Sequence, residues 1–142
     1  MVKLFVLNGG SNVGKSTTLN LLIDLFQIIS SRYEICFDPE HYEDVNDRWA
    51  WFIFEGKKIG ICTSGDNYEA CNKNLSFFQD NECDIAVCAS HVWSVDAKKY
   101  QRKLERKDIP FESIKKDSAV DPKHYVIQLF LLICKELQIS IN

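Results

Sequence analysis

The chain has 142 residues, enough to bury a core, and we expect residues 1–142 to form a single domain. Hydrophobic residues make up 46% and charged residues 26%, and the net charge of −3 gives no global attraction to nucleic acid or to an anionic membrane. The six cysteines form no C-x-x-C pair and have no zinc-ligand spacing, which favours a reducing, cytoplasmic compartment. The longest apolar run near the C-terminus, 125–134, is too short to span a bilayer, so we expect no membrane span.

Strands and helices alternate along the sequence. The predicted elements are a strand at 2–7, a helix at 15–29, a strand at 33–37, an acidic loop at 38–47, hairpin strands at 49–54 and 58–62, a helix capped by Asp66, a strand at 84–88, a helix at 94–106, a strand at 111–114 and a last helix opened by Asp121-Pro122. This order predicts an α/β fold with helices on both faces of a mainly parallel sheet of five or six strands, including one β-hairpin.

Between the first strand and the first helix, the sequence matches the phosphate-binding pattern G-x-x-x-x-G-K-[ST] at every fixed position. Its residues are Gly9, Gly10, Ser11, Asn12, Val13, Gly14, Lys15 and Ser16. Glycines let backbone N–H groups turn inward to cradle phosphates, and the helix that follows adds its positive end. We expect Lys15 to be an exposed loop-end charge on the β- and γ-phosphates, Ser16 to bind Mg²⁺ and Thr17 to reach the α-phosphate.

Over about residues 1–29 the chain thus resembles the P-loop (Walker A) NTPase superfamily. The resemblance implies a three-layer, Rossmann-like fold that binds a nucleoside triphosphate with Mg²⁺. The rest of the chain fits the superfamily only in its rhythm of strands and helices.

The second half of the site is less defined. A P-loop enzyme uses a second acid near Mg²⁺, directly after an apolar strand, and Asp84 lies at the wrong end of its strand. Asp66 is the candidate ligand and catalytic acid, although it is equally suited to be only a helix cap. Asp38, after the second strand, is a candidate catalytic base or a solvated loop acid. Polar residues Thr63, Ser64 and His91 are further candidates for contacts with water or phosphate.

Two other features bear on the ligand and partners. Lys98, Arg102 and Arg106 share one helix face, which is either a solvated surface or a contact for phosphate, nucleic acid or an acidic partner. Guanine-specific members of the superfamily carry Asn/Thr-Lys-x-Asp, and 114–117 matches this only at Lys115 and Asp117. We therefore expect ATP, with GTP as the alternative.

These observations leave three functions open. The first is an Mg²⁺-dependent hydrolase acting as a switch or regulatory ATPase with a protein partner. The second is a small-molecule or nucleotide kinase with a phosphate-bearing acceptor, supported by Asp38, Arg48 and the basic helix. The third is a non-catalytic nucleotide sensor. Binding to a membrane or to nucleic acid is disfavoured.

Overall fold

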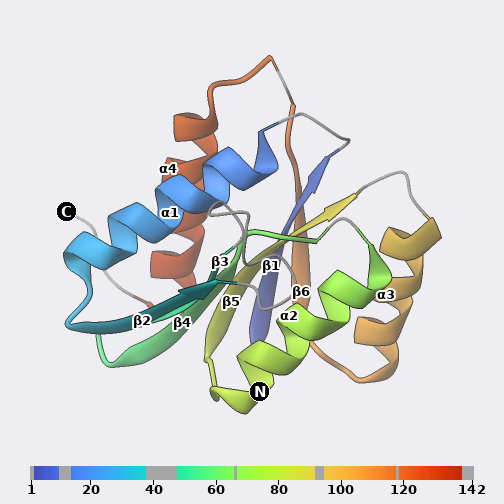
Figure 1. The fold of residues 1–142 in the computed structure, drawn as a ribbon, viewed down its shortest axis with the longest axis horizontal. Helices are drawn as coiled ribbons and strands as arrows, with labels where there is room; N and C mark the ends of the chain where they lie inside the picture. The colour runs from blue at the N-terminus through green and yellow to red at the C-terminus, as the bar shows by residue number, and fades with distance from the viewer. Residues whose placement is uncertain are drawn as a thin grey trace.

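A computed structural model describes residues 2–9, 14–37, 48–65, 67–91, 95–117 and 119–138. These residues form an α/β fold with four helices and a six-stranded mixed sheet (Figure 1). The elements are β1 (Lys3–Gly9), α1 (Lys15–Ile29), β2 (Arg32–Phe37), β3 (Arg48–Phe54), β4 (Lys57–Cys62), α2 (Tyr68–Asp80), β5 (Ile85–His91), α3 (Val95–Arg106), β6 (Phe111–Lys115) and α4 (Pro122–Glu136).

The strands lie in the order β2-β3-β4-β5-β1-β6. The pairs β4–β5, β5–β1 and β1–β6 are parallel, whereas β3 is antiparallel to both β2 and β4. β3 therefore runs against the other five strands. The expected hairpin is confirmed as β3–β4, but the sheet is mixed and not simply parallel, because β2 pairs with the hairpin and not with a parallel neighbour.

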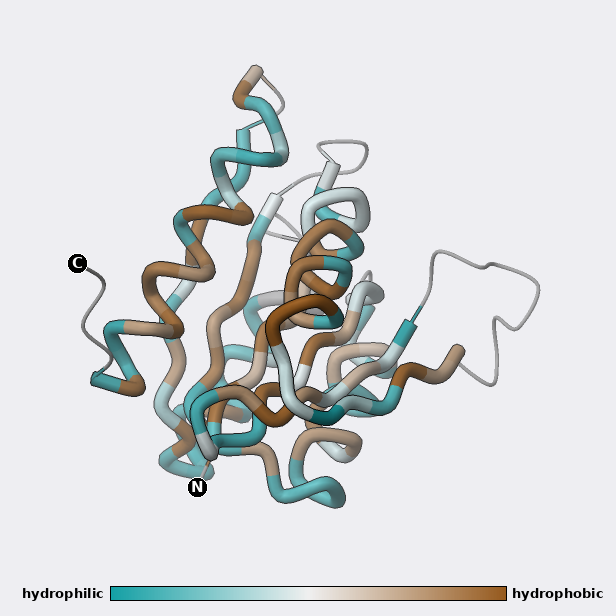
Figure 2. Tube along the Cα trace, turned by 90° about the vertical axis from the view of Figure 1, so that its left-hand side faces the viewer, coloured by the Kyte–Doolittle hydropathy of each residue, from teal (hydrophilic) through white to brown (hydrophobic). Residues whose placement is uncertain are grey.

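Helices cover both faces of this sheet. On one face, apolar residues of α1 and α4 pack with Phe5 and Leu7 of β1 in one hydrophobic core. On the other face, α2 and α3 pack with Leu4 and Val6 in a second core. β1 is therefore buried on both sides, which explains its uninterrupted apolar sequence. Figure 2 shows hydrophobic residues along the central strands and on the helix sides that face them.

The predicted helix at 15–29 is confirmed at both ends. Gly14 is its N-cap in the left-handed conformation, with φ of 84°, a region that glycine enters without steric cost. Leu19, Leu22, Ile23 and Phe26 are fully buried, as their spacing along a helix requires.

The start of α2 requires a correction. The helix begins at Tyr68, and its N-cap is Asn67, whose side chain accepts a hydrogen bond from the Ala70 N–H at 2.8 Å. Asp66, which was expected to be the cap, lies outside the described residues. By contrast, the predicted Asp121-Pro122 start of α4 is confirmed, since the Asp121 carboxylate accepts from the Lys123 N–H.

Within the described ranges, no helix has the length and apolar character needed to cross a membrane.

Candidate functional site

The carboxyl ends of β1 and β5 lie side by side, with Gly9 in register with His91. The chain leaves β1 toward α1 on one face of the sheet, and leaves β5 toward α3 on the opposite face (Figure 1). In open α/β sheets, ligands commonly bind outside the carboxyl ends of neighbouring strands whose connections go to opposite faces. The topology therefore places the candidate site between β1 and β5.

Lys15 lies at these strand ends. Its ammonium donates hydrogen bonds to the backbone carbonyls of Gly9, at 2.8 Å, and Ser90, at 3.0 Å, so it bridges the ends of β1 and β5. The residue is only 8% exposed, which corrects the expectation of an exposed charge. The sequence could not predict the second bond, because Ser90 is brought to Lys15 only by the pairing of β1 with β5.

The neighbours of Lys15 in the phosphate-loop pattern occupy the expected elements. Gly9 ends β1 and Gly14 caps α1, while Ser16 and Thr17 lie in the first turn of that helix. Ser16 is half-buried and Thr17 is exposed. Gly10, Ser11, Asn12 and Val13 lie outside the described residues.

A second lysine, Lys116, is buried beside the phosphate loop. It follows β6, is 3% exposed, and its ammonium lies 4.7 Å from the centre of the Tyr125 ring. A Cβ atom added at Gly14 would lie 3.4 Å from the Lys116 Cε, so the lysine packs directly against the N-cap of α1. Sequence reasoning missed this residue, because it fits no fixed position of the guanine pattern at 114–117.

The surroundings of Lys116 compensate its charge only in part. The carbonyls of Asp117 and Val120 lie at 3.5 and 3.4 Å, and the described residues offer it no ion pair. Burial lowers the pKa of the Lys116 ammonium, opposed in part by the nearby carboxylates of Asp117 and Asp121. The site thus holds a cation that would gain from a further anion.

Two buried polar atoms near Lys15 have no hydrogen-bond partner in the described part of the chain. They are Oδ1 of Asn8 and Oγ of Ser90. The two residues are in register on β1 and β5, and both point to the face covered by α2 and α3. Both oxygens are therefore able to accept a hydrogen bond at the carboxyl ends of β1 and β5.

The loop after β4 approaches the same strand ends. A Cβ at Gly65 would overlap the backbone carbonyl of Ala89, so only glycine fits this contact. The carbonyl of Ser64 accepts a hydrogen bond from the Asn74 side chain at 2.7 Å, and Thr63 Oγ1 accepts one from the Arg48 N–H. The loop that holds candidates Thr63 and Ser64 is therefore fixed against β3, β5 and the middle of α2.

The candidate acids are less informative. Asp38 and Asp66 lie outside the described residues. Asp84 precedes β5 and accepts a hydrogen bond from the Lys58 N–H at 2.9 Å, which confirms that it lies at the opposite end of the strand from Lys15. Among the residues described, no group of three His, Cys, Asp or Glu side chains is arranged to hold a metal ion.

Two other candidates have structural surroundings that bear on their roles. Arg48 donates to Oδ1 of Asn20 at 2.7 Å and lies 3.5 Å from the Asp24 carboxylate, so its guanidinium is held against α1. Oδ1 of Asp117 accepts from the Ala119 N–H within its own loop. His91 ends β5, and its side chain is not among those described.

No known family model matches this sequence, and no curated protein matches it significantly. The functional argument therefore rests on the residues and their geometry.

Proposed function

We propose that this chain binds the phosphates of a nucleoside triphosphate between the ends of β1 and β5, and hydrolyses it as a small switch or regulatory ATPase. The observation that carries the proposal is the Lys15 ammonium held by the carbonyls of Gly9 and Ser90. A lysine fixed at the first residue of a helix, next to that helix's N-terminal N–H groups, is suited to bind a phosphate.

Electrostatics give independent support. Lys15 and Lys116 are both less than 10% exposed, and both lie against residues of the phosphate-loop pattern. Burying ammonium groups among neutral carbonyls costs free energy, and an anion that reaches them recovers part of that cost. A polyphosphate is an anion of suitable charge for two neighbouring cations.

The architecture is compatible with the P-loop NTPase superfamily. In the proposed assignment, β1 is the strand before the phosphate loop, α1 is the helix after it, and α1, the sheet and α2–α3 make three layers. The antiparallel β3 is an addition to the parallel core formed by β4, β5, β1 and β6.

The oxygen atoms at the site suit Mg²⁺, which prefers hard oxygen ligands and keeps several waters. Ser16 is the proposed protein ligand, since its hydroxyl lies in the first turn of α1 next to Lys15. The unpaired oxygens of Asn8 and Ser90 are suited to hold waters of such an ion, and Asp66 remains the proposed acidic ligand. When bound with the nucleotide, Mg²⁺ would neutralise charge on the phosphate oxygens.

The kinase alternative loses one of its arguments. Arg48 was a candidate clamp for an acceptor phosphate, but its guanidinium is engaged by Asn20 and Asp24. Asp38 remains untested as a base. We therefore place hydrolysis first, and we retain ATP as the preferred nucleotide because the guanine pattern at 114–117 is incomplete at Ile114.

Three measurements test the proposal. Calorimetric titration with a non-hydrolysable ATP analogue and with its GTP counterpart, each with Mg²⁺, should show binding that favours ATP. Release of free phosphate from ATP should be slow but dependent on Lys15. Absence of binding by both analogues would refute the proposal. Binding without phosphate release would favour the sensor, whereas transfer to a member of an acceptor panel would favour the kinase.

A further inference from the structure

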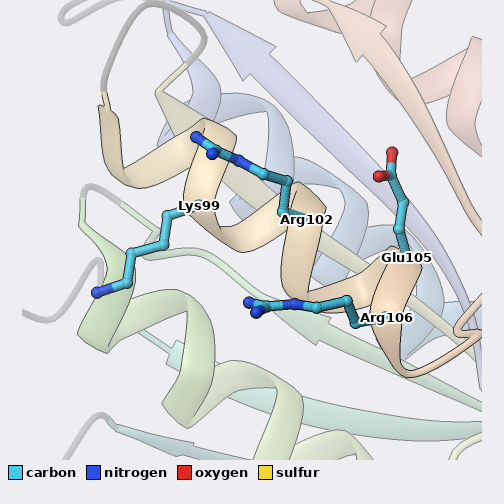
Figure 3. A pocket seen from close by; sticks show the side chains of 4 residues that line it. All are labelled: Lys99, Arg102, Glu105 and Arg106. Atoms are coloured by element: carbon cyan, nitrogen blue, oxygen red, sulfur yellow. The ribbon is translucent and has the colours of Figure 1, made fainter.

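The outer surface of α3 carries a cluster of cations that the nucleotide site does not use. Lys99, Arg102 and Arg106 line a surface hollow of about 600 Å³ together with Glu105. Figure 3 shows the three cationic side chains on one side of α3, with Glu105 reaching away from them. We call this surface the α3 basic face.

The cations of the α3 basic face are exposed. Lys99, Arg102 and Arg106 form no ion pair within the described residues. The Arg102 Nε donates to the backbone carbonyl of Lys98 at 3.3 Å, and the Lys99 ammonium lies 4.2 Å from the centre of the Tyr68 ring. This arrangement leaves the charges available to an external anion.

These charges also act on Tyr68. The pKa of its phenol is lowered by a hydrogen bond with Asn72 and, further, by the positive charges of Lys103, Lys99 and Arg106. Lys103 also donates a hydrogen bond to Asn72 at 2.6 Å. Lys99 and Lys103 of α3 thus lie over the Tyr68 ring in the first turn of α2, a turn that also carries the exposed acid Glu69.

This surface adjoins the candidate nucleotide site. Tyr68 begins α2 three residues after Gly65, whose loop packs against Ala89 of β5. A partner bound to the α3 basic face would therefore contact the helix that follows this loop. In the switch reading of the protein, this is a suitable place for a partner to sense the bound nucleotide.

We propose that the α3 basic face docks an acidic segment of a protein partner. At 1.5 Å of rise per residue, Lys99, Arg102 and Arg106 span roughly 10 Å along the helix. In an extended peptide, alternate carboxylates lie roughly 7 Å apart, so two or three of them match this span. Arginine binds carboxylates in a bidentate manner, which favours such pairing.

Three features favour an acidic peptide over nucleic acid. Glu105 lines the same hollow, Asp108 follows α3, and the chain has a net charge of −3. An unbroken row of phosphates would be repelled by the carboxylates of Glu105 and Asp108. A peptide can place its acidic side chains opposite the cations and a neutral residue or a hydrogen-bond donor opposite Glu105. The proposal does not depend on nucleotide binding.

The test is fluorescence anisotropy with a labelled twelve-residue peptide of alternating Glu and Ser, at physiological ionic strength and without nucleotide. We expect the peptide to bind, the matched Gln-Ser peptide not to bind, and binding to weaken at least tenfold in a triple variant Lys99→Glu, Arg102→Glu, Arg106→Glu. The control variant Lys57→Glu, Lys123→Glu, Lys135→Glu changes the net charge equally at exposed positions elsewhere and should bind like the wild type.

Several outcomes would overturn the proposal. These are no binding of the acidic peptide to the wild type, equal loss in both triple variants, or tighter binding of an oligonucleotide with the same number of charges. Circular dichroism melts show whether both triple variants fold. If the α3 variant does not, Arg102→Gln with Arg106→Gln replaces it, and unchanged affinity in that folded double variant would equally refute the proposal.

Discussion

Replacing Lys15 by methionine tests the central interaction, because methionine keeps a long apolar stem and removes only the ammonium. That ammonium now makes two hydrogen bonds to carbonyls, at 2.8 and 3.0 Å. When phosphate oxygens replace the carbonyls as acceptors these bonds are exchanged, and the net gain is the attraction between opposite charges, about 4 kcal/mol for a pair about 4 Å apart at an effective dielectric constant of roughly 20. We therefore expect nucleotide affinity to fall by at least roughly 100-fold, since about 1.4 kcal/mol corresponds to tenfold.

The same substitution should change the stability of the free protein little. It removes two hydrogen bonds, but it also removes a buried charge, and these effects oppose one another. We expect the Tm to shift by less than about 5 °C, as a chain of this size shifts by roughly 3 °C per kcal/mol. Calorimetry with a non-hydrolysable ATP analogue gives the affinity, and Lys57→Met, at an exposed site, is the control. An affinity within threefold of the wild type would refute the role given to Lys15.

Three further substitutions separate other parts of the site. Ser16→Ala should weaken nucleotide binding in Mg²⁺ more than in chelator, because its hydroxyl is the proposed ligand; equal losses in both would remove that role. Asp66→Asn should leave the Tm unchanged, because Asn67 caps α2. Phosphate release by this variant therefore tests the Asp66 carboxylate alone, and full activity would exclude Asp66 from the site. Lys116→Met should keep or raise the Tm but weaken binding, since it removes a buried charge that an anion would stabilise. Burial lowers the pKa of the Lys116 ammonium, whereas a bound phosphate favours its protonated form. The nucleotide affinity of the wild type should therefore fall as the pH rises through that lowered pKa. This pH dependence should disappear in Lys116→Met; if it persists, another group is responsible for it.

The parts of the fold that were predicted correctly depend on local sequence. The helix at 15–29 follows from apolar spacing and from the glycine before Lys15, and both act within a few residues. The hairpin follows from the short Glu55-Gly56 turn between two apolar strands. The Asp121-Pro122 start of α4 is likewise decided by its own side chain and ring.

The errors arose where distant segments or competing residues decide the structure. β2 pairs with β3 across ten intervening residues, and the strand pattern alone does not distinguish that partner from a parallel one. At the start of α2, Asp66 and Asn67 are both good N-caps by residue type. The choice depends on which side chain reaches the N–H of Ala70, and the structure gives it to Asn67.

The candidate site shows why a motif describes only part of a binding site. The phosphate-loop pattern identifies Lys15 and Ser16, but it says nothing of Lys116 or Ser90, which are 101 and 75 residues from Lys15 along the chain. Lys116 is a buried cation without an ion pair in the described residues, and Ser90 has a buried hydroxyl without a hydrogen bond there, so each is unfavourable by itself. Side chains chosen only for stability would be apolar at both positions. In the proposed function, an anionic ligand with its waters would contact both side chains, and its binding free energy would offset what the free protein loses.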